Sequence, residues 1–386
     1  MKQETAIVHL GRETASAVRA VNPPLVRAST IVSDSLATFR KGYGEKVFDS
    51  LRYGRSGTAT TFELQRMMAA LEETEGCIAT TSGLSAIVAV LATFSGPGRH
   101  VLVSDGVYGP TRAYCEKVLV PAGTDVEFYG PADDIKARIR KDTSLIFVES
   151  PASLTMEMYD IRQICAMAKS ANIPVAADST WGTPVFFRAH ALGIDLSIHA
   201  ATKYINGHSD LLLGLITGTN DALEKVRAQC DLNGTHAAPD ACWLTLRGIR
   251  TLSVRMRRHQ ATAMELAEWL QNRPEVRRVL FPALDTDPGH DLWRNQFSGA
   301  AGPFTIELTK CDEASFARFI DSLRLFALGT SWGGFESLVM PAIPHHLRNA
   351  EQADEGRLVR LHIGLESPDD LRADLEVAFA AMTGTL

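Results

Sequence analysis

Several features that assign proteins to common classes are missing from this sequence. Its 386 residues carry 39 Lys and Arg against 45 Asp and Glu, so the formal net charge is −6, and no strongly basic stretch occurs. This balance argues against a binding surface for nucleic acid or for an anionic membrane. The longest apolar runs, such as residues 86–91, are far shorter than the roughly 20 residues of a membrane span. The polar first residues lack the apolar segment of a signal peptide. We therefore expect a cytoplasmic protein that binds neither nucleic acid nor a membrane.

Motifs for metals and nucleotides are also missing. The six cysteines are scattered and none forms a CxxC pair, which favours reduced, buried thiols over disulfides or a zinc site. The patterns HExxH, GxxxxGK[ST] and GxGxxG do not occur. The sequence thus argues against metal hydrolases, P-loop enzymes and the common dinucleotide-binding enzymes, and it predicts no metal site.

What the sequence contains is a regular alternation of short apolar runs and helical segments. The chain is 45% hydrophobic and long enough for two domains. Apolar runs occur at residues 101–103, 126–129, 145–148, 174–177 and 196–198. Buried strands that alternate with helices predict an α/β fold, with a central, mostly parallel sheet and helices on both faces. Ligands of such sheets bind at the carboxyl ends of the strands.

This pattern divides the chain into three regions. Residues 1–50 look irregular and are expected to form an extended N-terminal arm that lies on another surface. Residues 51–247 hold the α/β alternation, and residues 248–386 predict a smaller α+β C-terminal domain. A continuous helical pattern at residues 244–264 marks the change between these two domains.

The segment from Ser197 to Asp210 carries the densest chemical signal. Lys203 follows an apolar run and lies among small and hydroxyl residues, where an amine is poorly solvated. Most lysines are simply exposed, which is one interpretation. The other is that the amine forms a Schiff base, with Thr202 donating a hydrogen bond to a phosphate beside it. The segment alone favours neither.

Asp178 ends an apolar run and is expected to project into the ligand crevice at the end of a strand. Taken alone, it is better explained as the N-cap of the following turn. Together with a Schiff-base lysine one βα unit later, the carboxylate gains a role. It would keep the pyridine nitrogen of pyridoxal phosphate (PLP) protonated and so make the ring a better electron sink.

Two further segments suit the same cofactor. Gly83 opens an apolar helix, where free backbone N–H groups bind phosphate well, although a Ser-Gly helix cap is a common alternative. Tyr108 follows the next apolar run. Its ring could stack on a planar cofactor, and the alternative is an ordinary half-buried tyrosine.

These segments occur in an order that resembles one enzyme family. The sequences SGLSA, VYGPT, DSTW and ATKYINGHSD begin at residues 82, 107, 178 and 201. They resemble the Cys/Met-metabolism branch of fold-type-I PLP enzymes. The resemblance covers nearly the whole chain, because it also includes residues 21–30, 53–58, 247–252 and 359–366. It implies the fold-type-I architecture and PLP as the cofactor.

The resemblance implies a role for each matching residue. Lys203 would bind PLP as a Schiff base and later take the substrate Cα proton, and Tyr108 would stack on the ring and move protons. Asp178 would pair with the pyridinium. The phosphate would be held by Gly83, Leu84 and Thr202.

The same resemblance implies a substrate site and an oligomer. Arg360 would bind the α-carboxylate of a small amino-acid substrate, a task suited to a bidentate guanidinium, with Ser331 and Trp332 lining that end of the pocket. Tyr53 and Arg55 would reach the phosphate of a neighbouring subunit, which the N-terminal arm would also contact. A homotetramer, as a dimer of dimers, is therefore expected.

Residues 149–157 and 331–337 are most similar to those of bacterial cystathionine β-lyases. This similarity implies a carbon–sulfur β-lyase that converts cystathionine to homocysteine, pyruvate and ammonia. The alternative is a γ-lyase of the same family, acting on cystathionine, a methionine-like or another γ-substituted amino acid. A γ-synthase or sulfhydrylase is third. A cofactor-free scaffold would need none of the side chains named above.

Three positions depart from the family pattern. Ala200 stands where a serine is usual, so one phosphate hydrogen bond worth about 1 kcal/mol is missing. Ser179 replaces an asparagine after the aspartate, and Ser56 replaces a second arginine. None removes a catalytic group, but together they indicate a divergent member whose substrate could differ from cystathionine.

Overall fold

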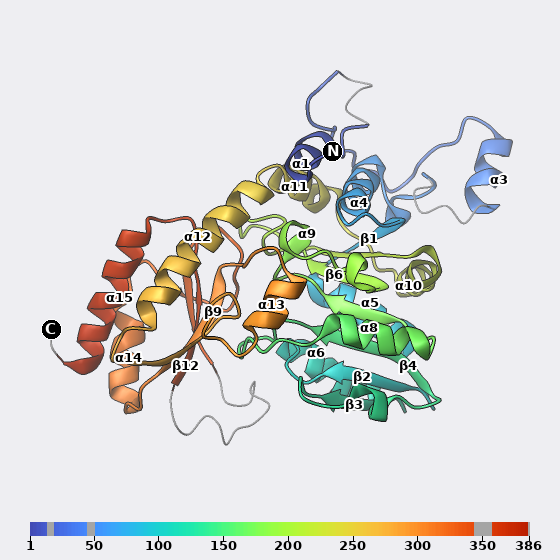
Figure 1. The fold of residues 1–386 in the computed structure, drawn as a ribbon. Coiled ribbons are helices and arrows are strands. Elements are labelled where there is room, and N and C mark those ends of the chain that lie inside the picture. Colours follow the sequence, from blue (N-terminus) through green and yellow to red (C-terminus); the bar gives the residue numbers. More distant parts are fainter. Residues whose placement is uncertain (14–18, 45–50, 343–356, 385–386) are drawn as a thin grey trace.

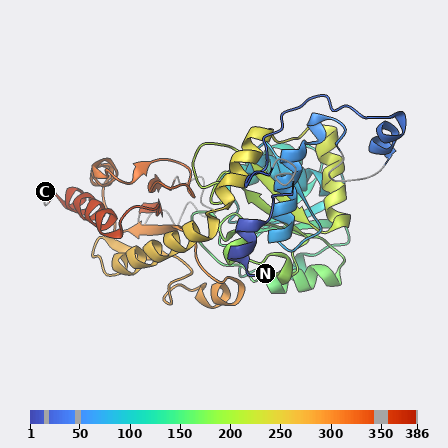
Figure 2. The same ribbon diagram turned by 90° about the horizontal axis from the view of Figure 1, so that it is seen from above.

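Two lobes lie side by side in the computed structural model, which describes residues 1–13, 19–44, 51–342 and 357–384. A long helix, α12 (Leu252–Leu270), runs from the larger lobe along the smaller one (Figures 1 and 2). None of the helices in these ranges is long and apolar enough to cross a lipid bilayer.

The larger lobe is built on a seven-stranded sheet with the order β1-β7-β6-β5-β4-β2-β3. Its strands are β1 (Gly76–Thr80), β2 (His100–Ser104), β3 (Asp125–Tyr129), β4 (Thr143–Glu149), β5 (Val175–Asp178), β6 (Leu196–Ala200) and β7 (Gly214–Gly218). Neighbouring strands are parallel except that β7 is antiparallel to both β1 and β6. The predicted central, mostly parallel sheet is confirmed, while β1 and β7 are additions that the apolar runs did not indicate.

Helices cover both faces of this sheet, as predicted. Successive side chains of a strand point to opposite faces, so Val101 belongs to one hydrophobic cluster and Leu102 to the other. The first cluster includes residues of α5 (Gly83–Phe94) and α10 (Asn220–Asn233), and the second those of α4 (Ala59–Leu71) and α8 (Ile161–Ser170). With both faces covered, a ligand reaches the sheet at the ends of its strands.

The smaller lobe contains a second sheet with the order β10-β11-β12-β9-β8. Its strands are β8 (Val276–Leu280), β9 (Pro303–Leu308), β10 (Ala327–Leu328), β11 (Leu338–Pro341) and β12 (Arg357–His362). The helices α14 (Glu313–Ser322) and α15 (Pro368–Thr383) pack against each other, and α15 also contacts α12. This arrangement is the expected α+β fold.

The predicted helix over residues 244–264 is in fact two helices, α11 (Pro239–Ile249) and α12. The chain turns between them at Arg250. Its guanidinium donates hydrogen bonds to the carbonyl oxygens of Ile7 and Leu10. The break therefore coincides with a contact to the N-terminal residues, which no local helical pattern encodes.

Within the first fifty residues, the described ranges 1–13 and 19–44 are less irregular than expected. They contain α1 (Gln3–His9), which packs on the same chain through the buried Ile7, and α3 (Leu36–Gly44). Figure 1 shows α3 standing away from the body of the molecule at the end of an extended segment. Val32 and Leu36 in this region are strongly exposed. Contact with a neighbouring subunit stays a prediction.

Candidate active site

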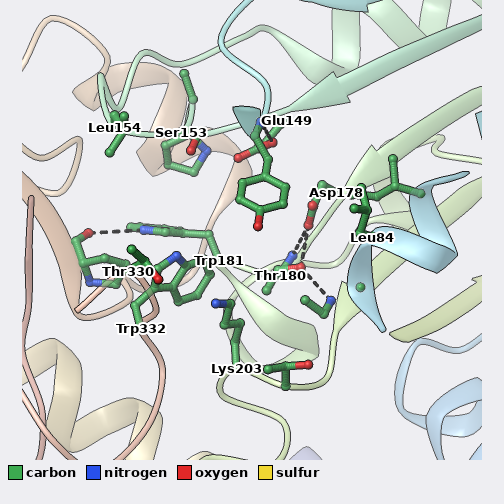
Figure 3. Close-up of a pocket in the computed structure, with 18 of the residues that line it drawn as sticks. Leu84, Glu149, Ser153, Leu154, Asp178, Thr180, Trp181, Lys203, Thr330 and Trp332 are labelled. Carbon is green, nitrogen blue, oxygen red and sulfur yellow. Dashed lines mark hydrogen bonds between the residues drawn. The ribbon is translucent and has the colours of Figure 1, made fainter. Parts of the chain in front are cut away.

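A cavity lies at the carboxyl ends of β4, β5 and β6, where the smaller lobe meets the sheet (Figure 3). Its lining includes eight residues singled out from the sequence, which are Gly83, Leu84, Tyr108, Asp178, Thr202, Lys203, Trp332 and Arg360. They come from segments as far apart as α5 and β12. The fold thus brings most of the candidate residues to one place.

Lys203 follows β6 and points into this cavity (Figure 3). Its Nζ donates a 2.7 Å hydrogen bond to Ser331 Oγ and lies 5.3 Å from the centre of the Trp332 ring. Burial, with the charge of Arg360 second, lowers the pKa of Lys203 to about 8, and the charge of Asp178 acts in the opposite direction. Near pH 7 a larger fraction of this amine is neutral than in an exposed lysine. The neutral form is the one that acts as a nucleophile or a base.

Asp178 ends β5 and is held from one side. Its Oδ1 accepts hydrogen bonds from the backbone N–H of Thr180 at 3.0 Å and from Thr180 Oγ1 at 2.5 Å. Burial raises the pKa of Asp178, and the bonds from Thr180 together with the charges of His199 and Lys203 oppose that rise. The second carboxylate oxygen has no hydrogen-bond partner within the described ranges, so it is free to accept from a ligand.

Glu149 is a cavity residue that the sequence analysis did not single out. It ends β4 directly beside Asp178 in the strand register, and its Oε2 accepts a 2.7 Å hydrogen bond from the backbone N–H of Tyr108. Burial, with the charge of Asp178 second, raises the pKa of Glu149 well above its ordinary value, against the effect of the Tyr108 N–H. Glu149 therefore fixes the backbone of Tyr108 at the start of α6 (Gly109–Tyr114).

The amino end of α5 forms a place for an anion. The Ser82 side chain caps the Ser85 N–H, whereas the N–H groups of Gly83 and Leu84 have no hydrogen-bond partner among the residues described. A Cβ atom on Gly83 would lie 2.5 Å from the Cβ of Ala200. Helix α5 and strand β6 thus approach so closely that only glycine fits, which leaves free donors beside the cavity.

Thr202 lines the same end of the cavity, but its hydroxyl is already engaged. Thr202 Oγ1 accepts from the backbone N–H of Leu213 at 3.0 Å and lies 3.3 Å from the Leu213 carbonyl oxygen. A hydrogen bond from Thr202 to a phosphate would replace the longer of these two contacts.

Arg360 lies on β12 and is 7% exposed. Its Nη2 donates to the carbonyl oxygens of Thr330 at 3.0 Å and Ser331 at 3.1 Å. No carboxylate pairs with Arg360 in the part of the chain that the structure describes. Burial lowers its pKa to about 10, and the group stays positively charged at neutral pH. A buried, unpaired guanidinium is costly for a folded protein, which indicates that an anionic ligand completes this site.

Tyr53 and Arg55 do not line this cavity. Tyr53 is 46% exposed and precedes the 3-10 helix η1 (Gly54–Ser56), while Arg55 Nη1 donates to the carbonyl oxygen of Asp231 at 3.1 Å. Their reach into a neighbouring subunit is not visible in one chain and stays a prediction. Across the described ranges there is also no group of three His, Cys, Asp or Glu residues able to hold a metal ion.

Comparison with known proteins identifies the family. Residues 4–380 match the profile of the family described as Cys/Met metabolism PLP-dependent enzyme. This chain belongs to that family. It is 42% identical over 389 residues to cystathionine beta-lyase of Bordetella avium, covering 97% of this chain and 96% of that protein. It is 38% identical over 389 residues to cystathionine beta-lyase MetC of Escherichia coli K12, covering 98% of each.

A solved structure shows the same fold. Cystathionine gamma-lyase from Lactobacillus plantarum, complexed with L-serine, superposes with a TM-score of 0.90 and is 29% identical in sequence, covering 99% of this chain and 100% of the other. The expected fold-type-I architecture, with its central mostly parallel sheet and smaller second domain, is confirmed.

The residues of this PLP-dependent enzyme fit the cofactor. The free N–H groups at the amino end of α5 suit the phosphate, the open oxygen of Asp178 suits the pyridine nitrogen, and the amine of Lys203 suits the aldehyde. The sequence analysis missed Glu149, Thr180, Trp181 and Thr330 as cavity residues. All four lie within or next to motifs that it quoted, so proximity to a motif was the available signal.

Proposed function

We propose that this enzyme is a carbon–sulfur β-lyase that converts cystathionine to homocysteine, pyruvate and ammonia. The observation that carries the proposal is that the unpaired guanidinium of Arg360 and the amine of Lys203 face one cavity. An amino acid is a small ligand that would use both groups. The guanidinium would bind its carboxylate, and the amine would act at its reacting carbon. The relatives in B. avium and E. coli that are named cystathionine beta-lyase support the choice of substrate.

Arg360 binds the substrate α-carboxylate in this proposal. Its Nη2 is held by two backbone carbonyl groups, so the rest of the guanidinium is oriented before the substrate arrives. Trp332 lines the same end of the cavity, whereas Ser331 is not among the lining residues. The hydroxyl of Ser331 nevertheless connects this end to Lys203. The substrate Cα is thereby placed near the lysine amine.

When bound, PLP supplies an electron sink that stabilises negative charge at the substrate Cα. Lys203 takes the Cα proton, for which its lowered pKa is suited. The Cα electron pair then forms the Cα–Cβ double bond as the Cβ–S bond breaks. Tyr108, positioned through Glu149, donates a proton to the departing sulfur. The released aminoacrylate hydrolyses to pyruvate and ammonia.

Each of the three regions of the chain has its own role in the proposed function. We propose that residues 51–247 bind the cofactor, that residues 248–386 supply the carboxylate site, and that residues 1–50 contact a neighbouring subunit. Tyr53 and Arg55 then reach the neighbour's phosphate within a homotetramer. The proposed location is the cytoplasm, because the six cysteines are unpaired thiols, five of them buried.

A γ-lyase of the same family is the second candidate, since the solved neighbour is named cystathionine gamma-lyase. Incubating the PLP-loaded enzyme with L-cystathionine and identifying the products separates the two. Homocysteine with pyruvate supports the β-lyase. Cysteine with 2-oxobutyrate overturns it in favour of the γ-lyase.

Two controls accompany this assay. Lys203→Ala is expected to lose both the yellow colour of the bound cofactor and product formation. A yellow wild-type enzyme that releases neither pair of products would contradict cystathionine as the substrate. A wild-type protein that takes up no added PLP would contradict the whole assignment of the site.

A further inference from the structure

A short loop, residues 330–334, lies between Lys203 and the last strand of the smaller lobe. Two of its residues, Thr330 and Trp332, line the cavity (Figure 3). His362 is the last residue of β12 and is buried. It follows Arg360 by two positions, so both side chains lie on the same face of the strand. Both of these side chains contact the loop.

The contacts from β12 to the loop are hydrogen bonds of opposite polarity. Arg360 Nη2 donates to the carbonyl oxygens of Thr330 at 3.0 Å and Ser331 at 3.1 Å. His362 Nε2 accepts a 2.9 Å hydrogen bond from the backbone N–H of Gly333. The guanidinium thus binds carbonyl groups at the start of the loop, and the imidazole binds an N–H group near its end.

The contact with Gly333 determines the tautomer of His362. A ring nitrogen that accepts a hydrogen bond carries no hydrogen, so the hydrogen of the neutral ring is on Nδ1. The carbonyl oxygen of Gly334, 3.3 Å from Nε2, is then a neighbour and not an acceptor. Burial is the first of the causes that lower the pKa of His362 well below its ordinary value, while the Gly334 carbonyl acts in the opposite direction. The ring is therefore neutral at neutral pH and able to accept from Gly333.

The loop is also in direct contact with Lys203. Gly333 has a φ of 86°, and a Cβ atom there would lie 2.9 Å from both Lys203 Cβ and the backbone nitrogen of Tyr204. Only glycine fits such a close approach. Lys203 Nζ donates to Ser331 Oγ at 2.7 Å. A displacement of the loop would therefore change the surroundings of the lysine amine.

Neighbouring rings hold the imidazole of His362 in place. The ring centres of Tyr204 and His259 lie 5.9 Å and 5.5 Å from that of His362, and all three side chains are buried. His362 Nδ1 has no hydrogen-bond partner among the described residues. The bond to Gly333 is thus the main polar contact of a closely packed ring, and a buried polar group is costly unless it is used in this way.

We propose that His362 is a positioning residue for substrate binding, which fixes residues 330–334 and thereby places Arg360 and Trp332 at the carboxylate end of the cavity. This inference rests on the proposed role of Arg360, but not on cystathionine as the substrate. His362 is not among the residues that line the cavity, so it acts through the loop. Within the described ranges the loop makes no hydrogen bond to α5 or to Asp178, so cofactor binding depends on it less.

The test is the binding of L-alanine to PLP-loaded variants, measured by the change that it causes in the visible absorption of the bound cofactor. L-alanine has the α-carboxylate and the Cα hydrogen but no leaving group at Cβ. In His362→Leu the space is filled, but the buried N–H of Gly333 loses its acceptor. We expect the Kd for L-alanine to rise about tenfold, while the Kd for PLP stays within about twofold of the wild-type value.

Two further substitutions of His362 separate the hydrogen bond from the filling of space. His362→Gln brings an amide oxygen to the region of Nε2, and we expect a Kd for L-alanine within about threefold of the wild type. His362→Asn has the same amide on a side chain one carbon shorter, so it should behave like His362→Leu. The melting temperature of each variant is measured as well. In a merely structural role the Kd would follow the melting temperature and not the presence of an acceptor within reach.

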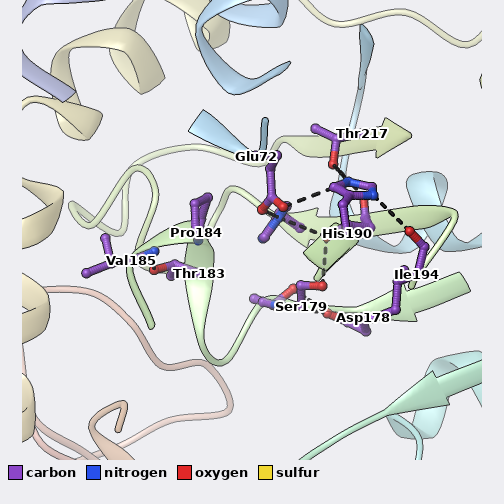
Figure 4. Close-up of polar contacts among 12 residues, drawn as sticks. Glu72, Asp178, Ser179, Thr183, Pro184, Val185, His190, Ile194 and Thr217 are labelled. Carbon is purple, nitrogen blue, oxygen red and sulfur yellow. Dashed lines mark hydrogen bonds and ion pairs between the residues drawn. The ribbon is translucent and has the colours of Figure 1, made fainter. Parts of the chain in front are cut away.

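Two other histidines serve as controls. His259 belongs to the same group of rings, but its Nδ1 donates to the carbonyl oxygen of Ile363 at 2.7 Å. His190 lies in the larger lobe, where Figure 4 shows it between Ile194 and Thr217, at distances of 2.9 Å and 3.0 Å. Neither forms a hydrogen bond with residues 330–334 in the described part of the chain. His259→Gln and His190→Gln should lower the melting temperature but leave the Kd for L-alanine unchanged.

A wild-type Kd for L-alanine in a folded His362→Leu variant would overturn the proposal. If that variant does not fold, a wild-type Kd in His362→Asn overturns it. Equal rises in the Kd for PLP and the Kd for L-alanine would also contradict it, because they would show a general disturbance of the cavity. None of these measurements involves cystathionine. A failure of the proposed substrate is therefore distinguishable from a failure of this inference.

Discussion

Lys203 Nζ donates a 2.7 Å hydrogen bond to Ser331 Oγ, although 128 residues separate the two in the chain. This contact joins the carboxyl end of the large sheet to the smaller lobe. It places the group proposed to take the substrate proton next to the loop whose carbonyl oxygens hold Arg360. The proposed proton transfer and the proposed recognition of the carboxylate are therefore linked through the side chain and the carbonyl group of one residue, Ser331.

Ser331→Ala is expected to weaken substrate binding more than cofactor binding. The loss of one hydrogen bond of about 1 kcal/mol predicts a rise in KM of about fivefold. The Kd for PLP is expected to stay constant, since the loop that carries Ser331 holds Arg360, at the proposed carboxylate site. Steady-state kinetics and PLP titration check this, with Ser170→Ala on the surface of α8 as the control. A changed Kd for PLP with an unchanged KM would place Ser331 on the cofactor side.

The lowered pKa of Lys203 predicts the pH dependence of cofactor uptake. Only the neutral amine attacks the aldehyde of PLP, so the rate at which the apoprotein takes up PLP should rise with pH and level off above about 8. Rapid-mixing absorbance measurements at a series of pH values give the midpoint. Arg360→Gln removes a neighbouring positive charge and should move the midpoint upward. A wild-type midpoint close to that of an exposed lysine would show that Lys203 is not buried as described.

Gly83→Ala should disturb the amino end of α5. The new methyl group would lie 2.5 Å from Ala200 Cβ and 2.9 Å from Ala200 Cα, so helix and strand must separate. We expect a loss of stability of about 1–3 kcal/mol and weaker PLP binding. Thermal unfolding of the apoprotein and PLP titration measure the two effects.

The double variant Gly83→Ala with Ala200→Gly is the internal control for that experiment. It removes the closer of the two contacts, so part of the stability and of the PLP affinity should return. Gly329→Ala meets only the end of the Leu338 side chain, at 3.3 Å, and should be much milder. Equal losses in Gly83→Ala and Gly329→Ala would argue against a special close approach at Gly83.

Arg360→Lys tests the carboxylate site. Lysine keeps the charge but cannot reproduce the fork that bonds two backbone carbonyl groups and a carboxylate together. We expect KM to rise about 10- to 100-fold, with the visible spectrum of bound PLP unchanged. The inhibition constant of a simple carboxylate should rise in parallel. A variant with wild-type KM would mean that another group binds the α-carboxylate.

The sequence predicted the strands β2 to β6, because each contains a short apolar run. The strands β2, β4, β5 and β6 are largely buried, whereas the edge strand β3 is fully buried only at Tyr129. It did not predict β1 and β7. These strands have the sequences GCIAT and GLITG, in which glycine and threonine dilute the apolar pattern. They are strands because they pair with each other, and β7 also with β6, a long-range arrangement that a local window does not contain.

In the candidate site, too, local motifs were predicted from the sequence, whereas residues placed by long-range contacts were not. Glu149 was overlooked as a functional residue because the residues around it in the sequence do not indicate that it lies beside Asp178 in the sheet. The conformation of the loop at residues 330–334 likewise depends on a long-range contact. Gly333, with φ of 86°, donates its N–H to His362 Nε2 at 2.9 Å, and this contact between distant residues helps hold the loop that places Trp332 in the cavity.

By itself the sequence determined the order and chemical type of most candidate residues that line the cavity. A short motif at the end of a strand can be recognised from neighbouring residues alone. In a parallel sheet whose strands are followed by helices, the last residues of the strands all lie at the same edge of the sheet. Only the tertiary structure decided how those residues behave. The lowered pKa of Lys203 and the unpaired charge of Arg360 arise from burial between segments distant in the chain. Burial depends on the packing of both lobes, and electrostatic interactions gain strength only where water is excluded.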